Sequence, residues 1–184
     1  MLADIFVSFQ DMPDKKIGIA LVYSGCRKAL AGNPCQECHN PHLWAFGGSG
    51  DEVRSRPLYK MSEEEGLSQI DGIVIFGGEP FDQDIDEVLQ DIGSFRERKP
   101  SLQVVIYTGY ESLQDAASGW LESNPYKSAL QHPFLKEADY IKIGSYRKDV
   151  PQNEGSSLAS GNQKMFRVVR NGAFVPVGLE EVSF

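Results

Sequence analysis

The chain has 184 residues, of which 41% are hydrophobic and 24% are charged, and its formal net charge is −8. This length and composition suit one globular domain with a substantial core, and the acidic balance argues against broad attraction to nucleic acid or anionic lipid. No apolar run is long enough for a membrane helix, and the first residues, MLADIFVSFQDMPDK, lack the pattern of a secretory signal, so we expect a cytoplasmic protein without membrane or nucleic-acid partners.

Four short apolar segments predict the strands of a parallel sheet. IGIALVY (17–23) is a continuous apolar run of strand length, and GIVIF (72–76) and QVVIY (103–107) are similar runs rich in β-branched residues. YIKI (140–143) is a weaker fourth example. Continuous runs of this kind are typical of strands that are buried on both faces.

Helical patterns lie between these segments. Residues 84–99 place apolar side chains on one face, with acidic residues early and basic residues late, and residues 112–122 show a second apolar face. Ser62 with Glu65 matches a capping box, although Gly66 weakens the helix it would open. The alternation predicts an α/β fold, either a partial (βα) barrel or an open, mostly parallel sheet.

The ends of the chain differ from this middle part. Residues 149–164 are polar and rich in Gly, Ser and Asn, which predicts a long surface loop that we expect to contact a partner. Asn171-Gly172 lies between two apolar-polar runs and predicts a β-hairpin with a two-residue turn over residues 166–177. We therefore expect a single domain over 1–184, with its core at about 17–166.

Three unusual loops follow the predicted strands. Cys26 comes after the first strand, GGEP (77–80) follows GIVIF, and TGY (108–110) follows QVVIY. Because function gathers at the carboxyl ends of parallel strands, we expect these loops to share one rim of the sheet.

The three cysteines of the chain, Cys26, Cys35 and Cys38, fall within thirteen positions. In a reducing compartment, such clustering favours metal ligation over disulfides. One interpretation is a structural zinc site, completed by His39 or His42. The other is a 4Fe-4S cluster that is held at three corners and leaves its fourth iron open to a ligand.

The segment IDGIVIFGGEPF (70–81) bears on this choice. Two glycines directly after a buried strand let the backbone approach a ligand closely, and Glu79 offers a carboxylate for an ammonium group. The plain alternative is a strand-to-helix turn, with Pro80 near the start of the helix.

Together these loops resemble the radical S-adenosylmethionine (radical SAM) enzymes, and within them the activating proteins of the anaerobic (class III) ribonucleoside-triphosphate reductase. The resemblance spans about residues 17–166. The similar segments are SGC (24–26), CQECHNPHLWAF (35–46), IDGIVIFGGEP (70–80), YTGY (107–110), ADYIKIGSY (138–146) and ASGNQ (159–163).

The resemblance implies roles for particular residues. Cys26, Cys35 and Cys38 would bind the 4Fe-4S cluster, and the open iron would chelate the methionine part of S-adenosylmethionine. Gly77, Gly78 and Glu79 would hold the ammonium group of that methionine. The backbone around Glu37 and His39 would lie against the adenosyl portion, with Thr108 contacting it from the next strand.

The implied activity is reductive cleavage of S-adenosylmethionine to a 5′-deoxyadenosyl radical, which would install a glycyl radical on a class III reductase subunit. A flavodoxin- or ferredoxin-like protein would donate the electron. Leu43, Trp44 and Phe46 either shelter the cluster or simply pack in the core. Two alternatives stay open: a small radical SAM enzyme acting on a small molecule such as a deazaguanine precursor, and a zinc-stabilised binding module without catalysis.

The chain departs from the family in its cysteine spacing. The family has C-x3-C-x2-C, whereas this chain has C-x8-C-x2-C, with five additional residues within the segment RKALAGNP (27–34). Because lengthening a loop costs little, we expect this segment to turn outward and return Cys35 to the cluster.

Overall fold

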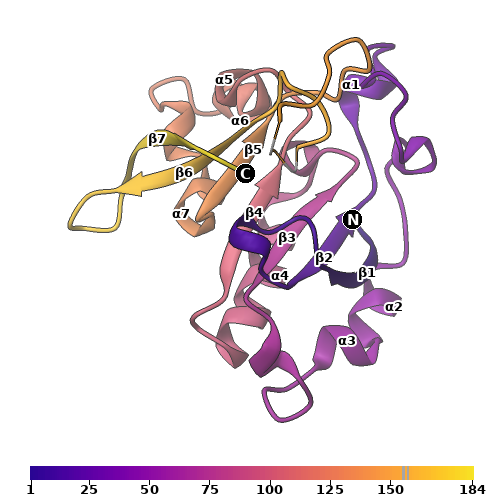
Figure 1. Ribbon diagram of the computed structural model, residues 1–184, viewed down its shortest axis with the longest axis vertical. Helices are drawn as coiled ribbons and strands as arrows, with labels where there is room; N and C mark the ends of the chain where they lie inside the picture. The colour runs from indigo at the N-terminus through magenta and orange to yellow at the C-terminus, as the bar shows by residue number, and fades with distance from the viewer. Residues whose placement is uncertain (155, 157) are drawn as a thin grey trace.

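The protein forms a mixed α/β fold around one seven-stranded sheet (Figure 1). The structure is a computed structural model and describes residues 1–154, 156 and 158–184. Its strands follow the order of the chain, so each strand neighbours the next in sequence. They are β1 (Leu2–Ser8), β2 (Gly18–Tyr23), β3 (Gly72–Gly77), β4 (Gln103–Tyr107), β5 (Tyr140–Ile143), β6 (Lys164–Arg170) and β7 (Pro176–Val182).

The sheet is parallel only in its centre. The pairings from β2 to β5 are parallel, as the apolar segments predict, whereas β1–β2, β5–β6 and β6–β7 are antiparallel. The expectation of a mostly parallel sheet is therefore wrong for the sheet as a whole. The difference arises because β1 pairs antiparallel with β2 and the C-terminal hairpin joins the same sheet.

The α-helices lie in the connections between the parallel strands β2 to β5. The predicted helix 84–99 is confirmed as α4, whose N-cap Asp84 accepts a hydrogen bond from the N–H of Glu87. The predicted helix 112–122 is divided at Ala117, where ψ is 0° and the hydrogen-bonding pattern breaks. The α-helices are α1 (Arg27–Leu30), α2 (Gly50–Ser55), α3 (Pro57–Lys60), α4 (Ile85–Arg98), α5 (Leu113–Ala116), α6 (Ser118–Glu122) and α7 (Pro133–Glu137).

Short 3-10 turns connect these elements. The capping box forms, because Ser62 N–H donates to Glu65 at 2.9 Å and Glu65 N–H donates back to the Ser62 hydroxyl at 3.3 Å. It closes a turn rather than an α-helix, since Gly66 follows with a φ of +123°. The 3-10 helices are η1 (Pro13–Lys15), η2 (Pro41–Leu43), η3 (Leu67–Gln69), η4 (Pro80–Asp82) and η5 (Ala129–Gln131).

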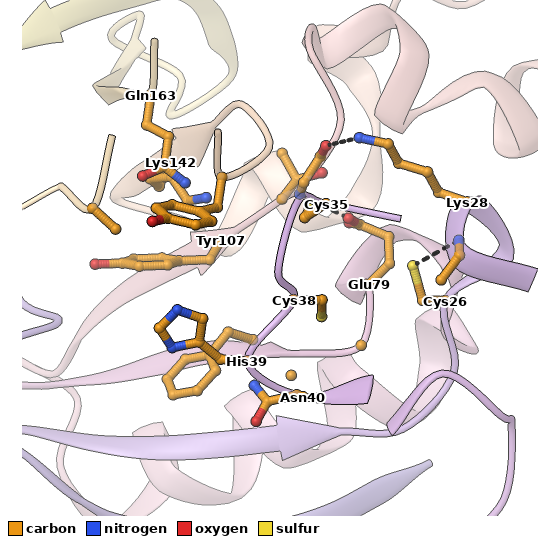
Figure 2. Close-up of a pocket in the computed structure, with 18 of the residues that line it drawn as sticks. Cys26, Lys28, Cys35, Cys38, His39, Asn40, Glu79, Tyr107, Lys142 and Gln163 are labelled. Atoms are coloured by element: carbon orange, nitrogen blue, oxygen red, sulfur yellow. Dashed lines mark hydrogen bonds between the residues drawn. The ribbon is translucent and has the colours of Figure 1, made fainter. Parts of the chain in front are cut away.

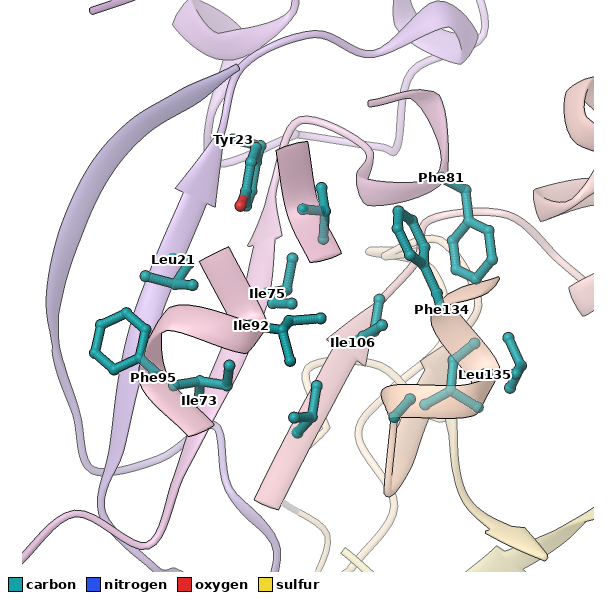
Figure 3. Packing of buried hydrophobic residues seen from close by; sticks show 14 of the residues in the cluster. Leu21, Tyr23, Ile73, Ile75, Phe81, Ile92, Phe95, Ile106, Phe134 and Leu135 are labelled. Atoms are coloured by element: carbon teal, nitrogen blue, oxygen red, sulfur yellow. The ribbon is translucent and has the colours of Figure 1, made fainter. Parts of the chain in front are cut away.

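The core has two parts because side chains alternate across the strands. Ile73 and Ile75 of β3 belong to the larger cluster, and Figure 3 shows them beside Ile92 and Phe95 of α4. Val74 points to the other face, where a smaller cluster contains Met12, Val105, Leu158 and Met165. Burial of such side chains contributes about 1.5–3 kcal/mol each.

A buried polar network joins α4 to the sheet and to α2. Asp91, which is fully buried, accepts hydrogen bonds from the hydroxyls of Tyr23 and Tyr59, both at 2.6 Å. Arg54 donates to the same carboxylate from Nε at 2.7 Å. This network fixes Tyr23, the last residue of β2, close to the start of the cysteine loop.

The C-terminal hairpin is present, but its predicted two-residue turn is wrong. Residues 171–175 connect β6 to β7, and the side chain of Asn171 accepts the N–H groups of Ala173 and Val175, each at 3.0 Å. This side-chain cap stabilises a wider loop than Asn-Gly alone predicts. Figure 1 shows the hairpin in yellow, extending from the sheet.

The predicted loop 149–164 contains residues 155 and 157, which lie outside the described residues. In the part of the chain that the structure describes, no helix combines the length and apolar character needed to cross a membrane.

Candidate functional site

The three loops expected at one rim line a common pocket of about 270 Å³ (Figure 2). The parallel register explains this, because Tyr23 pairs with Gly77, so that Cys26 and Glu79 leave adjacent strands at the same level. Thr108 and Gly109 follow β4 at the same edge. The expected shared rim is therefore confirmed.

Cys26, Cys35 and Cys38 all line this pocket as free, partly exposed thiols. Cys26 is the N-cap of α1, and its sulfur accepts the N–H of Ala29 at 3.4 Å. Burial raises the pKa of this thiol to about 11. The sulfur of Cys38 accepts the indole N–H of Trp44, also at 3.4 Å. Three thiols facing one space fit the donor chemistry of a metal-sulfur group, which binds thiolates.

The segment that lengthens the cysteine loop does not turn wholly outward. Its first residues form α1, and Lys28 and Ala29 line the pocket beside Cys26. The ammonium group of Lys28 donates to the carbonyl of Gly109 at 2.6 Å (Figure 2). Leu30, by contrast, is exposed. The segment therefore supplies part of the wall of the pocket, which corrects the expectation of a simple surface excursion.

The two glycines after β3 allow close contact with the end of β2. A Cβ on Gly77 would lie 2.4 Å from the carbonyl oxygen of Tyr23, and one on Gly78 would lie 2.3 Å from that of Gly25. Gly78 N–H donates to Tyr23 at 2.7 Å, and Glu79 N–H donates to Gly25 at 2.8 Å. Only glycine permits these backbone contacts, which hold the Gly-Gly-Glu turn against the cysteine loop.

Glu79 is a buried carboxylate in the wall of the pocket. Its oxygens accept the N–H groups of Gly109 at 2.8 Å and Phe81 at 3.2 Å. Burial raises the pKa of Glu79 to about 7, although these hydrogen bonds act in the opposite direction. A cation bound in the pocket would favour the ionised form of the Glu79 carboxyl group beside it.

Asp82 and Gln83, which follow Glu79 in the chain, form hydrogen bonds with the neighbouring loops. Asp82 accepts the N–H of Arg27 at 2.6 Å and the hydroxyl of Tyr110 at 3.1 Å, so it touches both neighbouring loops. The amide of Gln83 donates to the carbonyls of Gly25 and Glu79, both at 2.9 Å. These two side chains fix the relative positions of the three loops.

The remaining predicted residues lie in different surroundings. Thr108 is fully buried in the wall of the pocket, and His39 lines the pocket with its ring edge-on to Tyr146 at 5.7 Å. The side chain of Glu37 instead points to the surface and pairs with Lys148 at 2.5 Å. The prediction for Glu37 concerned its backbone, and its side chain does not line this pocket in the described structure.

Lys142 is a buried residue of the pocket that the sequence analysis did not single out. Its ammonium group donates to the carbonyl of Gly144 at 2.9 Å and lies 5.3 Å from the centre of the Tyr107 ring. Burial lowers the pKa of Lys142 to about 8, opposed by the nearby Cys35 and Glu79. The available signal was a lysine within the otherwise apolar strand YIKI.

Zinc coordination by four protein ligands requires a tight group around a single ion. Among residues 1–154, 156 and 158–184, no three His, Cys, Asp or Glu side chains are grouped in a way that would hold one metal ion. All three cysteines line the pocket (Figure 2).

Comparison with known proteins gives one match. A family model described as a 4Fe-4S single cluster domain matches residues 17–166, which covers the strands β2 to β5 and all three cysteines. Neither the search of curated proteins nor the search of solved structures gave a match. The thiol donors in the pocket agree with the iron-sulfur group that the family model describes.

Proposed function

The chain belongs to the family of 4Fe-4S single cluster domains, and on this basis we propose that it is a radical SAM enzyme. In this proposal Cys26, Cys35 and Cys38 hold a 4Fe-4S cluster, and S-adenosylmethionine binds beside it. The observation that carries the proposal is the meeting of three free cysteines and a Gly-Gly-Glu turn at one pocket. When bound, the cluster supplies the electron for reductive cleavage of S-adenosylmethionine.

The charges of the pocket suit a ligand with both an ammonium and a carboxylate group. Glu79 offers an ionisable carboxyl group for the ammonium, and Lys142 offers a buried cation for the carboxylate. Gly77 and Gly78 pack the turn against the backbone of Tyr23 and Gly25, which places Glu79 at the pocket. These three elements together would bind and orient the methionine part of the cofactor.

The apolar walls of the pocket would keep water from the reacting atoms. Phe76 and Tyr107 lie on neighbouring strands with ring centres 6.0 Å apart, and Leu158 closes the same side. A dry pocket strengthens electrostatic contacts and suppresses side reactions. Leu158 belongs to the segment 149–164, so this segment borders the space in which we place the substrate.

At the finer level, we propose that the protein installs a glycyl radical on a class III ribonucleotide reductase subunit and receives electrons from a flavodoxin- or ferredoxin-like protein. The segments NPHLWAF (40–46) and YTGY (107–110) favour this branch of the superfamily. We assign the parallel strands β2–β5 to the partial barrel of these enzymes, within a single domain whose core is about 17–166.

Anaerobic purification followed by measurement of iron, sulfide and zinc tests the first part of the proposal. We expect about four irons and four sulfides per chain, and 5′-deoxyadenosine after reduction with dithionite in the presence of S-adenosylmethionine. A Cys38→Ser variant should lose both the cluster and the product. One equivalent of zinc without sulfide would instead favour the zinc-stabilised binding module.

A second experiment separates the possible substrates. Mixing the reduced protein and S-adenosylmethionine with a class III reductase subunit should give the electron paramagnetic resonance doublet of a glycyl radical. If the cofactor is cleaved but no protein radical forms, a small-molecule substrate of the deazaguanine type replaces the proposed partner.

A further inference from the structure

Two of the three cysteine sulfurs accept N–H groups from their own chain. The indole N–H of Trp44 donates to Cys38, and the backbone N–H of Ala29 donates to Cys26, as the dashed line at Cys26 in Figure 2 shows. Both donor-to-sulfur distances are 3.4 Å. Of these two donors, only the indole can be removed by changing a side chain.

Trp44 contacts two of the cysteines at once. Its backbone carbonyl accepts the N–H of Cys26 at 2.9 Å, while its indole reaches the sulfur of Cys38. The adjacent Leu43 carbonyl accepts the N–H of Gly25 at 2.7 Å, which fixes this segment beside the end of β2. Trp44 also lines the pocket itself. Its indole is therefore held in place by the same segment that holds Cys26.

From this geometry we infer that Trp44 is a positioning residue whose indole N–H raises the reduction potential of the cluster. The inference rests on the proposed function, because it takes Cys38 as a cluster ligand. An N–H donor stabilises negative charge on sulfur, and reduction adds negative charge to the cluster and its thiolates. The donor consequently favours the reduced state more than the oxidised state, and its removal makes reduction harder.

A packing role alone predicts a different result. A phenylalanine at position 44 keeps an aromatic ring against the pocket but has no donor for the Cys38 sulfur. The other tryptophan, Trp120, is a matched control because it lies outside the pocket and packs edge-on to His132 at 5.3 Å. In the described part of the chain, its indole N–H donates to no protein atom.

The test compares the wild-type chain with Trp44→Phe and Trp120→Phe after anaerobic cluster assembly. Iron and sulfide are measured first, and each protein is then titrated with a reductant while the reduced cluster is followed by electron paramagnetic resonance. We expect a lower midpoint potential for Trp44→Phe only, with unchanged iron and sulfide. A Trp44→Phe potential equal to that of the wild type would overturn the inference.

A second variant covers the case in which Trp44→Phe assembles its cluster poorly. In the Trp120→Phe background, Trp44 is replaced by benzothienylalanine, which has nearly the shape of tryptophan but carries sulfur in place of the N–H. A lower potential than in the Trp120→Phe parent, measured on the fraction of chains that carry the cluster, supports the inference, since the donor is the feature that differs. An unchanged cluster with an unchanged potential overturns it. A wild-type chain that takes up no cluster overturns the proposed function, and this inference falls with it.

Discussion

The carboxylate of Glu79 accepts the backbone N–H of Gly109 at 2.8 Å, which joins the loop after β3 to the loop after β4 inside the pocket. The contact places a buried acid beside Gly109, whose added Cβ would lie 3.1 Å from the Cys35 sulfur. Glu79 therefore contributes both to the structure of the rim and to its charge.

The buried position of Glu79 predicts a specific dependence of stability on pH. Burial raises its pKa in the folded protein from 4.5 to about 7, so the folded state binds the proton more tightly than the unfolded state. The contribution is fully present below pH 4.5 and is lost as the pH rises through about 7. For the cluster-free protein, the stability lost is on the order of 3 kcal/mol.

A Glu79→Gln variant provides the measurement. Urea denaturation of the two cluster-free proteins at pH 5 and pH 8 should show that the difference in unfolding free energy favours the variant more at pH 8. Titrating groups whose pKa does not depend on Glu79, such as His132, change both proteins alike and cancel in this difference. A difference that does not vary with pH would contradict the assignment.

The glycine contact between β3 and the cysteine loop predicts a steric effect. In a Gly78→Ala variant the new methyl group meets the Gly25 carbonyl at 2.3 Å, so the two loops must separate. We expect a loss of about 1–3 kcal/mol in unfolding free energy and poor cluster assembly. Gly172→Ala is the control, because its Cβ would meet no described atom within 4 Å, and we expect a change within about 0.5 kcal/mol.

The network around Asp91 predicts a large loss of stability on substitution. Asp91→Ala leaves Arg54 partly buried without its main partner and leaves the hydroxyls of Tyr23 and Tyr59 without their acceptor. We expect the unfolding free energy to fall by about 3–5 kcal/mol. Glu97→Ala, an exposed substitution on the same helix, should change it by less than about 0.5 kcal/mol. Equal effects in thermal or urea denaturation would show that the network is unimportant.

Replacement of the buried Lys142 should have opposite effects on the stability of the protein and on its binding of S-adenosylmethionine. Lys142→Met removes a charge whose pKa is lowered to about 8 by burial, so the cluster-free protein should become more stable at neutral pH. Binding of S-adenosylmethionine to the cluster-loaded protein should weaken by about tenfold or more, since a charge-assisted hydrogen bond contributes about 1.5–3 kcal/mol. Calorimetric titration checks this prediction, with the exposed Lys127→Met as the control. Equal affinities for both variants would remove Lys142 from the binding site.

The central strands and α4 could be predicted because their signals are local. GIVIF and QVVIY are continuous apolar runs, and α4 combines a capped start with one apolar face. The strand β1 was missed because its sequence, LADIFVS, mixes Ala, Asp and Ser with apolar residues, and its burial depends on pairing with β2. The wide turn of the hairpin depends on the side chain of Asn171, which the Asn-Gly pair does not reveal.

The rim of the site was also predictable, since strand ends of a parallel sheet meet at one edge. Contacts made across the pocket were not. Lys142 reaches the pocket only because β5 lies beside β4, where Tyr107 pairs with it. The sequence favours Trp44 as a shelter for the cluster or as core packing, and its hydrogen bond to the Cys38 sulfur follows from the path of residues 40–46, which no periodic pattern encodes.

The N–H of Gly25 donates to the carbonyl of Leu43, and the carbonyl of Gly25 accepts hydrogen bonds from the Glu79 N–H and the Gln83 side-chain amide. The hydrogen bonds of Gly25, together with the bond from Arg27 N–H to Asp82, thus join residues 24–46 to residues 77–83. Anyone who transplants this centre into another scaffold should move both segments together, since the cysteine stretch alone would arrive without the neighbours that give it its shape.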